Sequence, residues 1–218
     1  MSKLKTLISR GKILESSHEI KCFIGSINGK TIFSTNNSYK TIRDLLRLTF
    51  THINDYKIVY LAIGSNLGNK KLNIERAKSK LQYFDLKILK CSKEYETKSW
   101  PNPKKPIFIN IILEIQTNLK PLELLKICNF IEKKLGRKKS KKNEPRTCDI
   151  DIIDYDQKII QSLNNILILP HPSMTTRNFV LIPLFEINRS WKHPKSKAKI
   201  VNLINSLPIK DLRSINQI

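Results

Sequence analysis

After residue 57 the hydrophobic positions follow two patterns in turn: apolar runs typical of buried strands, and apolar residues at helical spacing. Residues 58–63 form a continuous apolar run that ends at Gly64, which is typical of a buried strand. Further strands are predicted at residues 86–98, 108–116 and 149–154, and helices at residues 72–83 and 122–137. The second helix has apolar residues at helical spacing, which predicts a core-facing stripe rather than a cofactor site. The stripe consists of Leu124, Ile127, Cys128, Ile131 and Leu135.

This strand and helix order predicts the fold class. The sequence β-α-β-β-α-β is the split-βαβ, or ferredoxin-like, arrangement. We expect an α+β domain at residues 58–218, in which helices cover the sheet as a three-layer α/β/α sandwich. An extended piece at residues 168–171, a helix at 175–187 and short helical turns near the end complete the expected elements.

Residues 1–57 are predicted to form a separate N-terminal extension. Residues 1–20 are polar and are expected to be irregular. Two apolar runs, 21–25 and 30–33, flank an Asn-Gly pair, which is a strong hairpin signal. A helix is expected to begin near Ser38 and to continue to about residue 51. We therefore expect a small ββα extension, to which the sequence assigns no role.

Composition narrows the class of protein. Hydrophobic residues make up 40% of the chain, which excludes global disorder. No apolar run approaches the roughly 20 residues that span a bilayer, and the first residues lack the apolar segment of a signal peptide. The four cysteines lie far apart without a Cys-x-x-Cys pair, which argues against a zinc ribbon or a disulfide framework. We expect a cytoplasmic protein with reduced thiols and no membrane partner.

The formal net charge of +22 has two explanations. Such a surface attracts polyanions, including nucleic acids and nucleotides. Lys, Ile and Asn are abundant along the whole chain, however, and an AT-rich genome produces that bias without any partner. The densest basic cluster is residues 133–142, where seven of ten residues are Lys or Arg, and it suits a site that receives phosphates.

The segment Pro145-Arg146-Thr147-Cys148-Asp149-Ile150-Asp151 is the most informative part of the sequence. Positions i and i+2 of a strand share a face, so Asp149 and Asp151 are expected to point the same way. Two adjacent carboxylates repel each other unless a cation lies between them, and hard oxygen ligands favour Mg²⁺. The alternative is a solvated strand edge with two surface aspartates.

Three other segments carry side chains suited to ligands. Phe108 and Asn110 share a strand face, and together they would stack on a flat heterocycle and hydrogen-bond its edge. His171 follows an extended segment, and Arg177 and Phe179 begin the next helix. The alternatives are an ordinary half-buried strand and a structural histidine. Glu132, beside the apolar stripe, is expected to be either a surface residue or a buried polar contact to a ligand.

In their order and spacing these segments resemble the 6-hydroxymethyl-7,8-dihydropterin pyrophosphokinase family of folate biosynthesis, over about residues 58–190. The shared series is Gly64-Ser65-Asn66-Leu67, Phe108-x-Asn110, Gly136-Arg137, Pro145-Arg146-Thr147-x-Asp149-x-Asp151, Pro170-His171-Pro172 and Arg177-x-Phe179. One departure is the stretch 138–145, which lacks the tryptophan that the family often carries there.

The resemblance implies Mg²⁺-dependent transfer of pyrophosphate from ATP to 6-hydroxymethyl-7,8-dihydropterin, with release of AMP. It implies that Asp149 and Asp151 hold two Mg²⁺ ions, and that Arg137 and Arg146 neutralise the transferring phosphates. The implied ATP-binding residues are Glu132, Arg137, Arg146, His171 and Arg177. The implied pterin-binding residues are Thr97, Phe108, Asn110 and Phe179.

Two other functions fit part of the sequence. An RNA-binding protein would explain the charge, and residues 22–27 resemble the shorter motif of RRM domains. The longer aromatic motif is missing, however, and Asp149 and Asp151 would repel phosphates, so no nucleic-acid partner is expected. Another phosphotransferase would keep the nucleotide site, but Phe108 beside Asn110 favours a flat acceptor over a sugar.

Overall fold

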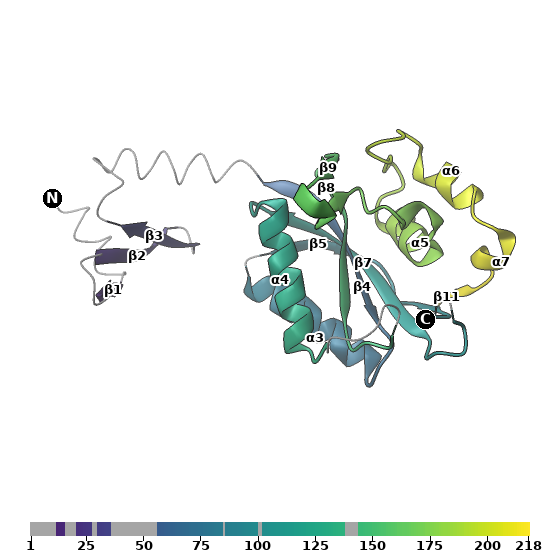
Figure 1. The fold of residues 1–218 in the computed structure, drawn as a ribbon, viewed down its shortest axis with the longest axis horizontal. Coiled ribbons are helices and arrows are strands. Elements are labelled where there is room, and N and C mark those ends of the chain that lie inside the picture. Colours follow the sequence, from purple (N-terminus) through teal and green to yellow (C-terminus); the bar gives the residue numbers. More distant parts are fainter. Residues whose placement is uncertain are drawn as a thin grey trace. The chain divides into compact units, whose positions relative to one another are not determined.

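The structure is a computed structural model that describes residues 12–15, 21–27, 30–35, 56–84, 86–99, 102–137 and 144–218. The chain divides into two compact units, Met1–Asp55 and Tyr56–Ile218, and each is considered by itself. The ribbon in Figure 1 labels the helices and strands of both units.

The described part of the first unit is a three-stranded antiparallel sheet. Its strands are β1 (Lys12–Glu15), β2 (Lys21–Ile27) and β3 (Lys30–Thr35), in the order β1-β2-β3. Ile27 pairs with Lys30 at the end of β2, as the hairpin signal predicts. The expectation that residues 1–20 are irregular is wrong at β1, because pairing with β2 rather than local pattern forms this strand. The Asn-Gly turn and the helix expected at 38–51 lie outside the described residues.

The second unit combines helices with a larger antiparallel sheet, so the expected α+β class is confirmed at the level of a mixed α/β domain. The sheet order is β11-β6-β7-β4-β8, and β5 also pairs with β7. The strands are β4 (Lys57–Ser65), β5 (Lys87–Cys91), β6 (Tyr95–Thr97), β7 (Phe108–Thr117), β8 (Asp149–Tyr155) and β11 (Ile215–Gln217). A separate two-stranded sheet joins β9 (Ile160–Gln161) to β10 (Ile168–Leu169).

Helices cover both faces of the larger sheet (Figure 1). Helices α3 (Lys70–Tyr83) and α4 (Pro121–Lys134) pack on one face, where they bury Ile74, Leu81 and Ile131 against β4 and β7. Helices α5 (Asn178–Ile187) and α6 (Ile200–Asn205) cover the other face. The remaining helical segments are α7 (Ile209–Leu212), η1 (Leu163–Asn165) and η2 (Met174–Thr176).

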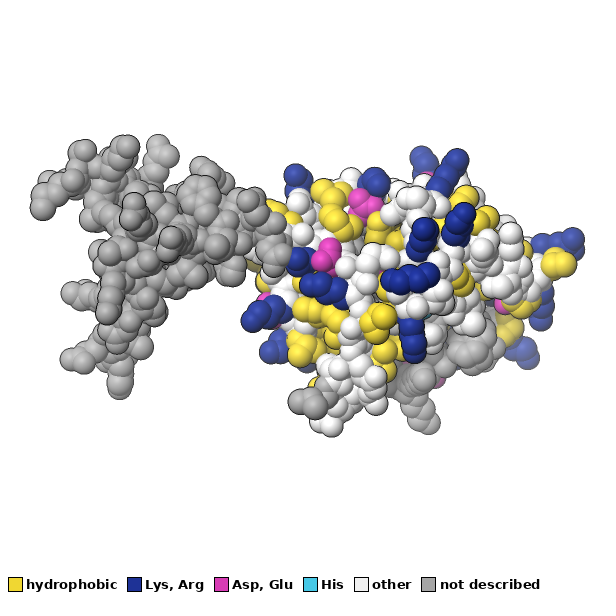
Figure 2. Space-filling model, turned by 90° about the horizontal axis from the view of Figure 1, so that it is seen from above, with side chains coloured by type: hydrophobic (Ala, Val, Ile, Leu, Met, Phe, Trp, Pro, Cys, Tyr) yellow, Lys and Arg dark blue, Asp and Glu magenta, His cyan; other side chains and the backbone are white. Residues whose placement is uncertain are grey.

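Among the described helices, none has the length and apolar character needed to cross a bilayer. On the face of the second unit shown in Figure 2, Lys and Arg side chains are scattered among hydrophobic and neutral ones. On this face the basic side chains are spread out rather than gathered into one patch.

The structure corrects several expected boundaries. The strand region at 86–98 is interrupted after β5, because the Ser92 hydroxyl accepts a hydrogen bond from the Ile112 N–H at 2.9 Å. The helix expected at 175–187 begins only at Asn178, after the 3₁₀ turn η2. The expected short helical turns near the end are present as α6 and α7, but the chain then pairs with β6 as β11.

Candidate active site

Gly64, near the end of β4, lies at the centre of the candidate site. Asn110 on β7 and Asp149 on β8 are its direct partners on either side, so their backbones lie roughly 10 Å apart across two strand spacings. A Cβ atom at Gly64 would lie 2.9 Å from Asn110 Oδ1 and 3.4 Å from Phe108 Cδ1. Because Gly64 has no side chain, Asn110 and Phe108 can lie directly over its backbone, while Asp149 lies on its other side.

The two aspartates of β8 share the face that Gly64 occupies. Ile150 and Ile152 are buried in the core beneath them, whereas the Asp149 and Asp151 side chains keep 25% and 35% of their surface exposed. This is the alternation that the sequence predicts for the strand. The partial exposure leaves both carboxylates accessible to a ligand.

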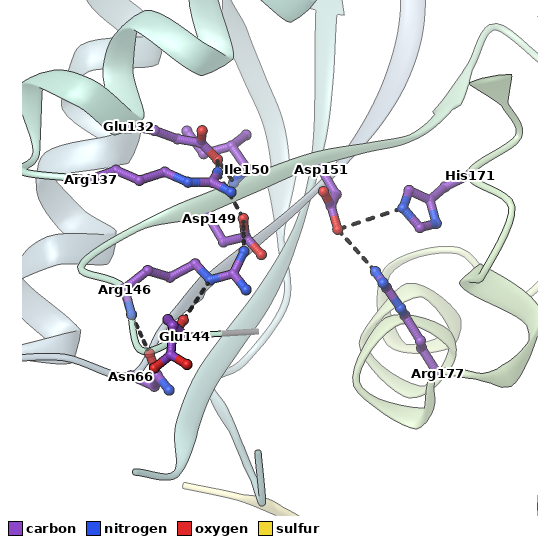
Figure 3. Close-up of polar contacts among 10 residues, drawn as sticks. All are labelled: Asn66, Glu132, Arg137, Glu144, Arg146, Asp149, Ile150, Asp151, His171 and Arg177. Atoms are coloured by element: carbon purple, nitrogen blue, oxygen red, sulfur yellow. Dashed lines mark hydrogen bonds and ion pairs between the residues drawn. The ribbon is translucent and has the colours of Figure 1, made fainter. Parts of the chain in front are cut away.

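Asp149 is neutralised by two arginines from different segments (Figure 3). Its Oδ1 accepts hydrogen bonds from Arg137 Nη1 at 3.0 Å and from Arg146 Nη1 at 2.9 Å. The Glu132 carboxylate also contacts Arg137, and it accepts a hydrogen bond from the Ile150 N–H at 2.7 Å. Glu132 is only 4% exposed, so it is the buried polar residue of the two alternatives and holds both Arg137 and the β8 backbone.

Asp151 has a second set of cationic partners (Figure 3). Arg177 Nη1, just before α5, donates to its Oδ2 at 3.0 Å, and His171 Nε2 lies 3.8 Å from the same oxygen. The His171 ring is oriented by the Ser173 N–H, which donates to Nδ1 at 3.2 Å. Since Nδ1 accepts, the proton of the neutral ring lies on Nε2, which faces Asp151.

Burial and neighbouring charge shift the pKa values of these groups. Burial raises the pKa of Asp149, the charge of Asp151 raises it further, and Arg146 and Arg137 oppose both effects. Burial also raises the pKa of Glu132, against the Ile150 N–H and Arg137. The pKa of His171 is lowered by burial, so the ring is neutral at pH 7.

Three of the residues expected at the pterin lie on the β7 side of Gly64. Asn110 Nδ2 donates to Thr97 Oγ1 at 2.9 Å, and both residues are buried. Thr97 pairs with Phe108 in the adjacent strand register. The structure thus brings Thr97, Phe108 and Asn110 together. Phe179, in the first turn of α5, lies next to Arg177, whose guanidinium carbon is 5.6 Å from its ring centre.

Sequence reasoning assigned no role to Gly64 or Asn66, although both belong to the shared series. Asn66 accepts a hydrogen bond from the Arg146 N–H at 2.7 Å, 80 residues away in the chain. The available signal was a glycine and an asparagine directly after a buried strand, and the same residues are common in ordinary turns.

Comparison with known proteins identifies the family. A model described as 7,8-dihydro-6-hydroxymethylpterin-pyrophosphokinase (HPPK) matches residues 60–189. The chain belongs to the HPPK family. The HPPK region includes every residue that we expected at the site.

Some curated relatives of this HPPK chain are matched over most of their length, and others over less than a quarter of it. The chain is 40% identical over 136 residues to the 2-amino-4-hydroxy-6-hydroxymethyldihydropteridine pyrophosphokinase of Aquifex aeolicus, covering 62% of the chain and 83% of that protein. It is 35% identical over 189 residues to the folic acid synthesis protein fol1 of Pneumocystis carinii, covering 87% of the chain but 24% of that protein. The corresponding Schizosaccharomyces pombe protein is 34% identical, and the chain spans 21% of its length.

Solved HPPK-DHPS structures share the fold. The Plasmodium falciparum HPPK-DHPS A437G structure with pteroate superimposes with a TM-score of 0.58 at 16% identity, over 75% of this chain and 47% of that one. At this level of identity the likeness supports the HPPK fold alone.

Proposed function

We propose that this chain acts as a 2-amino-4-hydroxy-6-hydroxymethyldihydropteridine pyrophosphokinase. It transfers pyrophosphate from ATP to the hydroxymethyl group of 6-hydroxymethyl-7,8-dihydropterin and releases AMP, a step of folate biosynthesis. Family membership supports this proposal. The observation that carries it is the row Asn110, Gly64 and Asp149, which sets an amide and an aromatic ring beside a cluster of acids and arginines.

Asp149 and Asp151 fit magnesium by their chemistry. Their oxygens are the ligand type that Mg²⁺ prefers, and Mg²⁺ is usually held by one or two carboxylates together with substrate phosphates. Within the described residues, no group of three or more His, Cys, Asp and Glu side chains is placed to hold a metal ion. We assign to these two carboxylates two Mg²⁺ ions that arrive with the nucleotide. Bound Mg²⁺ would supply countercharge and alignment for the phosphates.

The charges of the site support the same proposal. Glu132, Asp149 and Asp151 are matched by the three guanidinium groups that contact them. A tetra-anionic nucleotide needs positive charge beyond this balance, which two divalent ions would restore. Arg137 and Arg146 would then turn from Asp149 to the transferring phosphates, because the guanidinium fork matches phosphate oxygens.

The remaining residues follow from their positions. We assign His171 and Arg177 to the nucleotide phosphates, since both lie at Asp151. Glu132 supports nucleotide binding by holding Arg137. Such catalysis depends on positioning and countercharge rather than on covalent chemistry.

The pterin is assigned to the Phe108 side of Gly64. Phe108 and Phe179 would stack on its two faces, and Asn110 with Thr97 would hydrogen-bond its edge. Asn110 Nδ2 donates to Thr97, whereas Oδ1 lies over Gly64 and would accept from an N–H group of the pterin.

We also propose a ferredoxin-like topology for residues 58–218, with residues 1–57 as an N-terminal extension. The strand order and the placement of α3 after β4 and α4 after β7 support that topology. We propose a cytoplasmic location, which the free buried thiols of Cys128 and Cys148 support.

The test is whether the purified chain forms AMP, which is measured by chromatography. We expect AMP only when ATP, Mg²⁺ and 6-hydroxymethyl-7,8-dihydropterin are all present. ADP as the product, or AMP formed without the pterin, would contradict the proposal. Tight RNA binding without AMP formation would favour the RNA-binding alternative.

A further inference from the structure

Asn66, the first residue after β4, joins two segments that are distant in the chain. It is 3% exposed, and both ends of its amide have partners. Oδ1 accepts from the Arg146 N–H at 2.7 Å, and Nδ2 lies 3.2 Å from the Pro106 carbonyl and 3.3 Å from Ser99 Oγ. The Asn66 N–H also donates to the Arg146 carbonyl at 3.1 Å. Figure 3 shows the Asn66 amide next to the Arg146 main chain.

The two joined segments lead to opposite sides of the site. Arg146 reaches Asp149 on the side assigned to the phosphates. Ser99 and Pro106 belong to the connection between β6, which ends at Thr97, and β7, which begins at Phe108. The buried Asn66 amide therefore joins the segment that carries the phosphate-side arginine to the connection that flanks the pterin side. The more exposed ion pair of Lys105 Nζ and Glu144 Oε1, at 2.9 Å, joins the same two segments.

We propose that Asn66 is a positioning residue that holds the two substrate sites in register. This inference rests on the proposed function of the site. Asn66 acts through the Arg146 main chain and through the β6–β7 connection. Removing its amide leaves the Arg146 N–H without its side-chain partner and breaks the link to the β6–β7 connection, where the Pro106 carbonyl keeps only the hydrogen bond that Ser99 Oγ donates at 2.5 Å. The two segments then separate. A displacement of about 1 Å between reacting groups lowers the rate by about 100-fold.

Two substitutions separate the two links. Asn66→Ala removes both side-chain links and keeps only the backbone hydrogen bond from the N–H of residue 66 to the Arg146 carbonyl. Asn66→Asp keeps an oxygen that accepts from the Arg146 N–H but loses the donor to Pro106 and Ser99. We expect Asn66→Ala to lower kcat by about 100-fold. In Asn66→Asp, kcat stays within about tenfold of wild type, while KM for the pterin rises by at least about tenfold, because the site of one missing hydrogen-bond donor lies on the pterin side.

Asn73 offers a matched control. It is also a buried asparagine, and its Nδ2 donates to the Leu67 carbonyl at 2.9 Å and to Ser65 Oγ at 3.3 Å. It thus holds the same turn without contacting either substrate-side segment. Asn73→Ala should lower the midpoint of thermal unfolding about as much as Asn66→Ala, yet leave kcat and both KM values within about threefold of wild type, as expected of a purely structural hydrogen bond.

Steady-state kinetics of AMP release and amide hydrogen exchange test the inference together. The Arg146 N–H should lose exchange protection in Asn66→Ala and keep it in Asn66→Asp. Unchanged protection and kinetics in Asn66→Ala, or the same kinetic losses in Asn73→Ala, would overturn the inference. If Asn66→Ala does not fold, Asn66→Asp with unchanged KM for the pterin would overturn it. Wild-type protein that forms no AMP would instead refute the proposed function. The exchange comparison would still test whether Asn66 holds the Arg146 segment in place.

Discussion

Both ends of the β4–β8 pair contain carboxylates, but the carboxylates at the two ends differ in exposure and in the charge of their hydrogen-bond partners. At the far end, Asp154 is 1% exposed and accepts from Trp191 Nε1 at 2.8 Å and from Gln157. Its hydrogen-bond partners are neutral donors, the buried Trp191 indole and the exposed Gln157. At the Gly64 end, Asp149 and Asp151 are partly exposed, and their partners are long cationic side chains.

This difference separates a structural acid from an acid available to ligands. A buried carboxylate that accepts from neutral donors keeps its partners when a ligand binds. A carboxylate that is paired with arginines can give them up, because an arginine can also bind a phosphate. The direction of the pKa shift does not distinguish the structural acid from the acid available to ligands, because burial raises the pKa of both Asp149 and Asp154. The presence of a cavity does not distinguish them either. A cavity of about 320 Å³, lined in part by Tyr60, Asp154 and Trp191, also lies at the far end.

The largest effect is expected from Asp149→Asn. Removing this charge should lower kcat by about 1,000-fold or more, because the proposed ions would lose a ligand. Pterin binding, measured by calorimetry without metal, should change little, since Asn110 and Phe108 lie on the other side of Gly64. A kcat within tenfold of wild type would contradict the metal role.

Arg146→Ala should lower kcat by about 100-fold, because one charged donor to the transferring phosphates is lost. Arg146→Lys should recover part of this loss, since it restores the charge but not the fork. Arg189 is the control: it is exposed and stacks on Phe185 at 5.7 Å. Equal losses in Arg189→Ala would show that general surface charge, rather than the Asp149 cluster, sets the rate.

At the far end, Trp191→Phe should affect stability rather than activity. It removes the indole N–H that Asp154 accepts, and losing a partner of a buried polar group costs about 1–3 kcal/mol. Denaturant unfolding measures this cost, and kcat should stay within about twofold because the site lies at the other end of β4. A large loss of kcat at unchanged stability would contradict the purely structural role of the far end.

The smallest expected effect is a pH dependence at Asp154. Its pKa is raised in the folded state, chiefly by burial, so the folded chain binds more protons than the unfolded chain above the ordinary aspartate pKa. The stability contributed by Asp154 is therefore present at low pH and is lost as pH rises through the raised pKa. Relative to Asp154→Asn, wild type should be less stable at pH 7 than at pH 4 in urea unfolding. A difference that is independent of pH would contradict the raised pKa.

Local pattern explains which features could be predicted from the sequence. Alternation placed Asp149 and Asp151 on one face, and helical spacing placed Leu124, Cys128 and Ile131 in the core. Long-range partners could not be predicted in this way. Strand β11 forms only because the end of the chain pairs with β6, about 120 residues earlier.

The same limit applies to the site. The sequence indicated the acids and the cations but not which cation meets which acid. Arg177 reaches Asp151 from 26 residues away, and Asn66 reaches Arg146 from 80 residues away. Turn residues such as Asn66 have no periodic pattern, so only the folded chain shows what they hold together.

The most direct test of the contrast between the two ends is whether Asp149 and Asp151 hold a metal ion. We would measure Mn²⁺ binding by electron paramagnetic resonance in the presence of a non-hydrolysable ATP analogue. Mn²⁺ replaces Mg²⁺ at oxygen ligands and reports binding without turnover. Wild type and Trp191→Phe should bind Mn²⁺ with the nucleotide, and the Asp149→Asn, Asp151→Asn double variant should lose that binding. Equal Mn²⁺ binding by the double variant would show that these two carboxylates do not hold the ion.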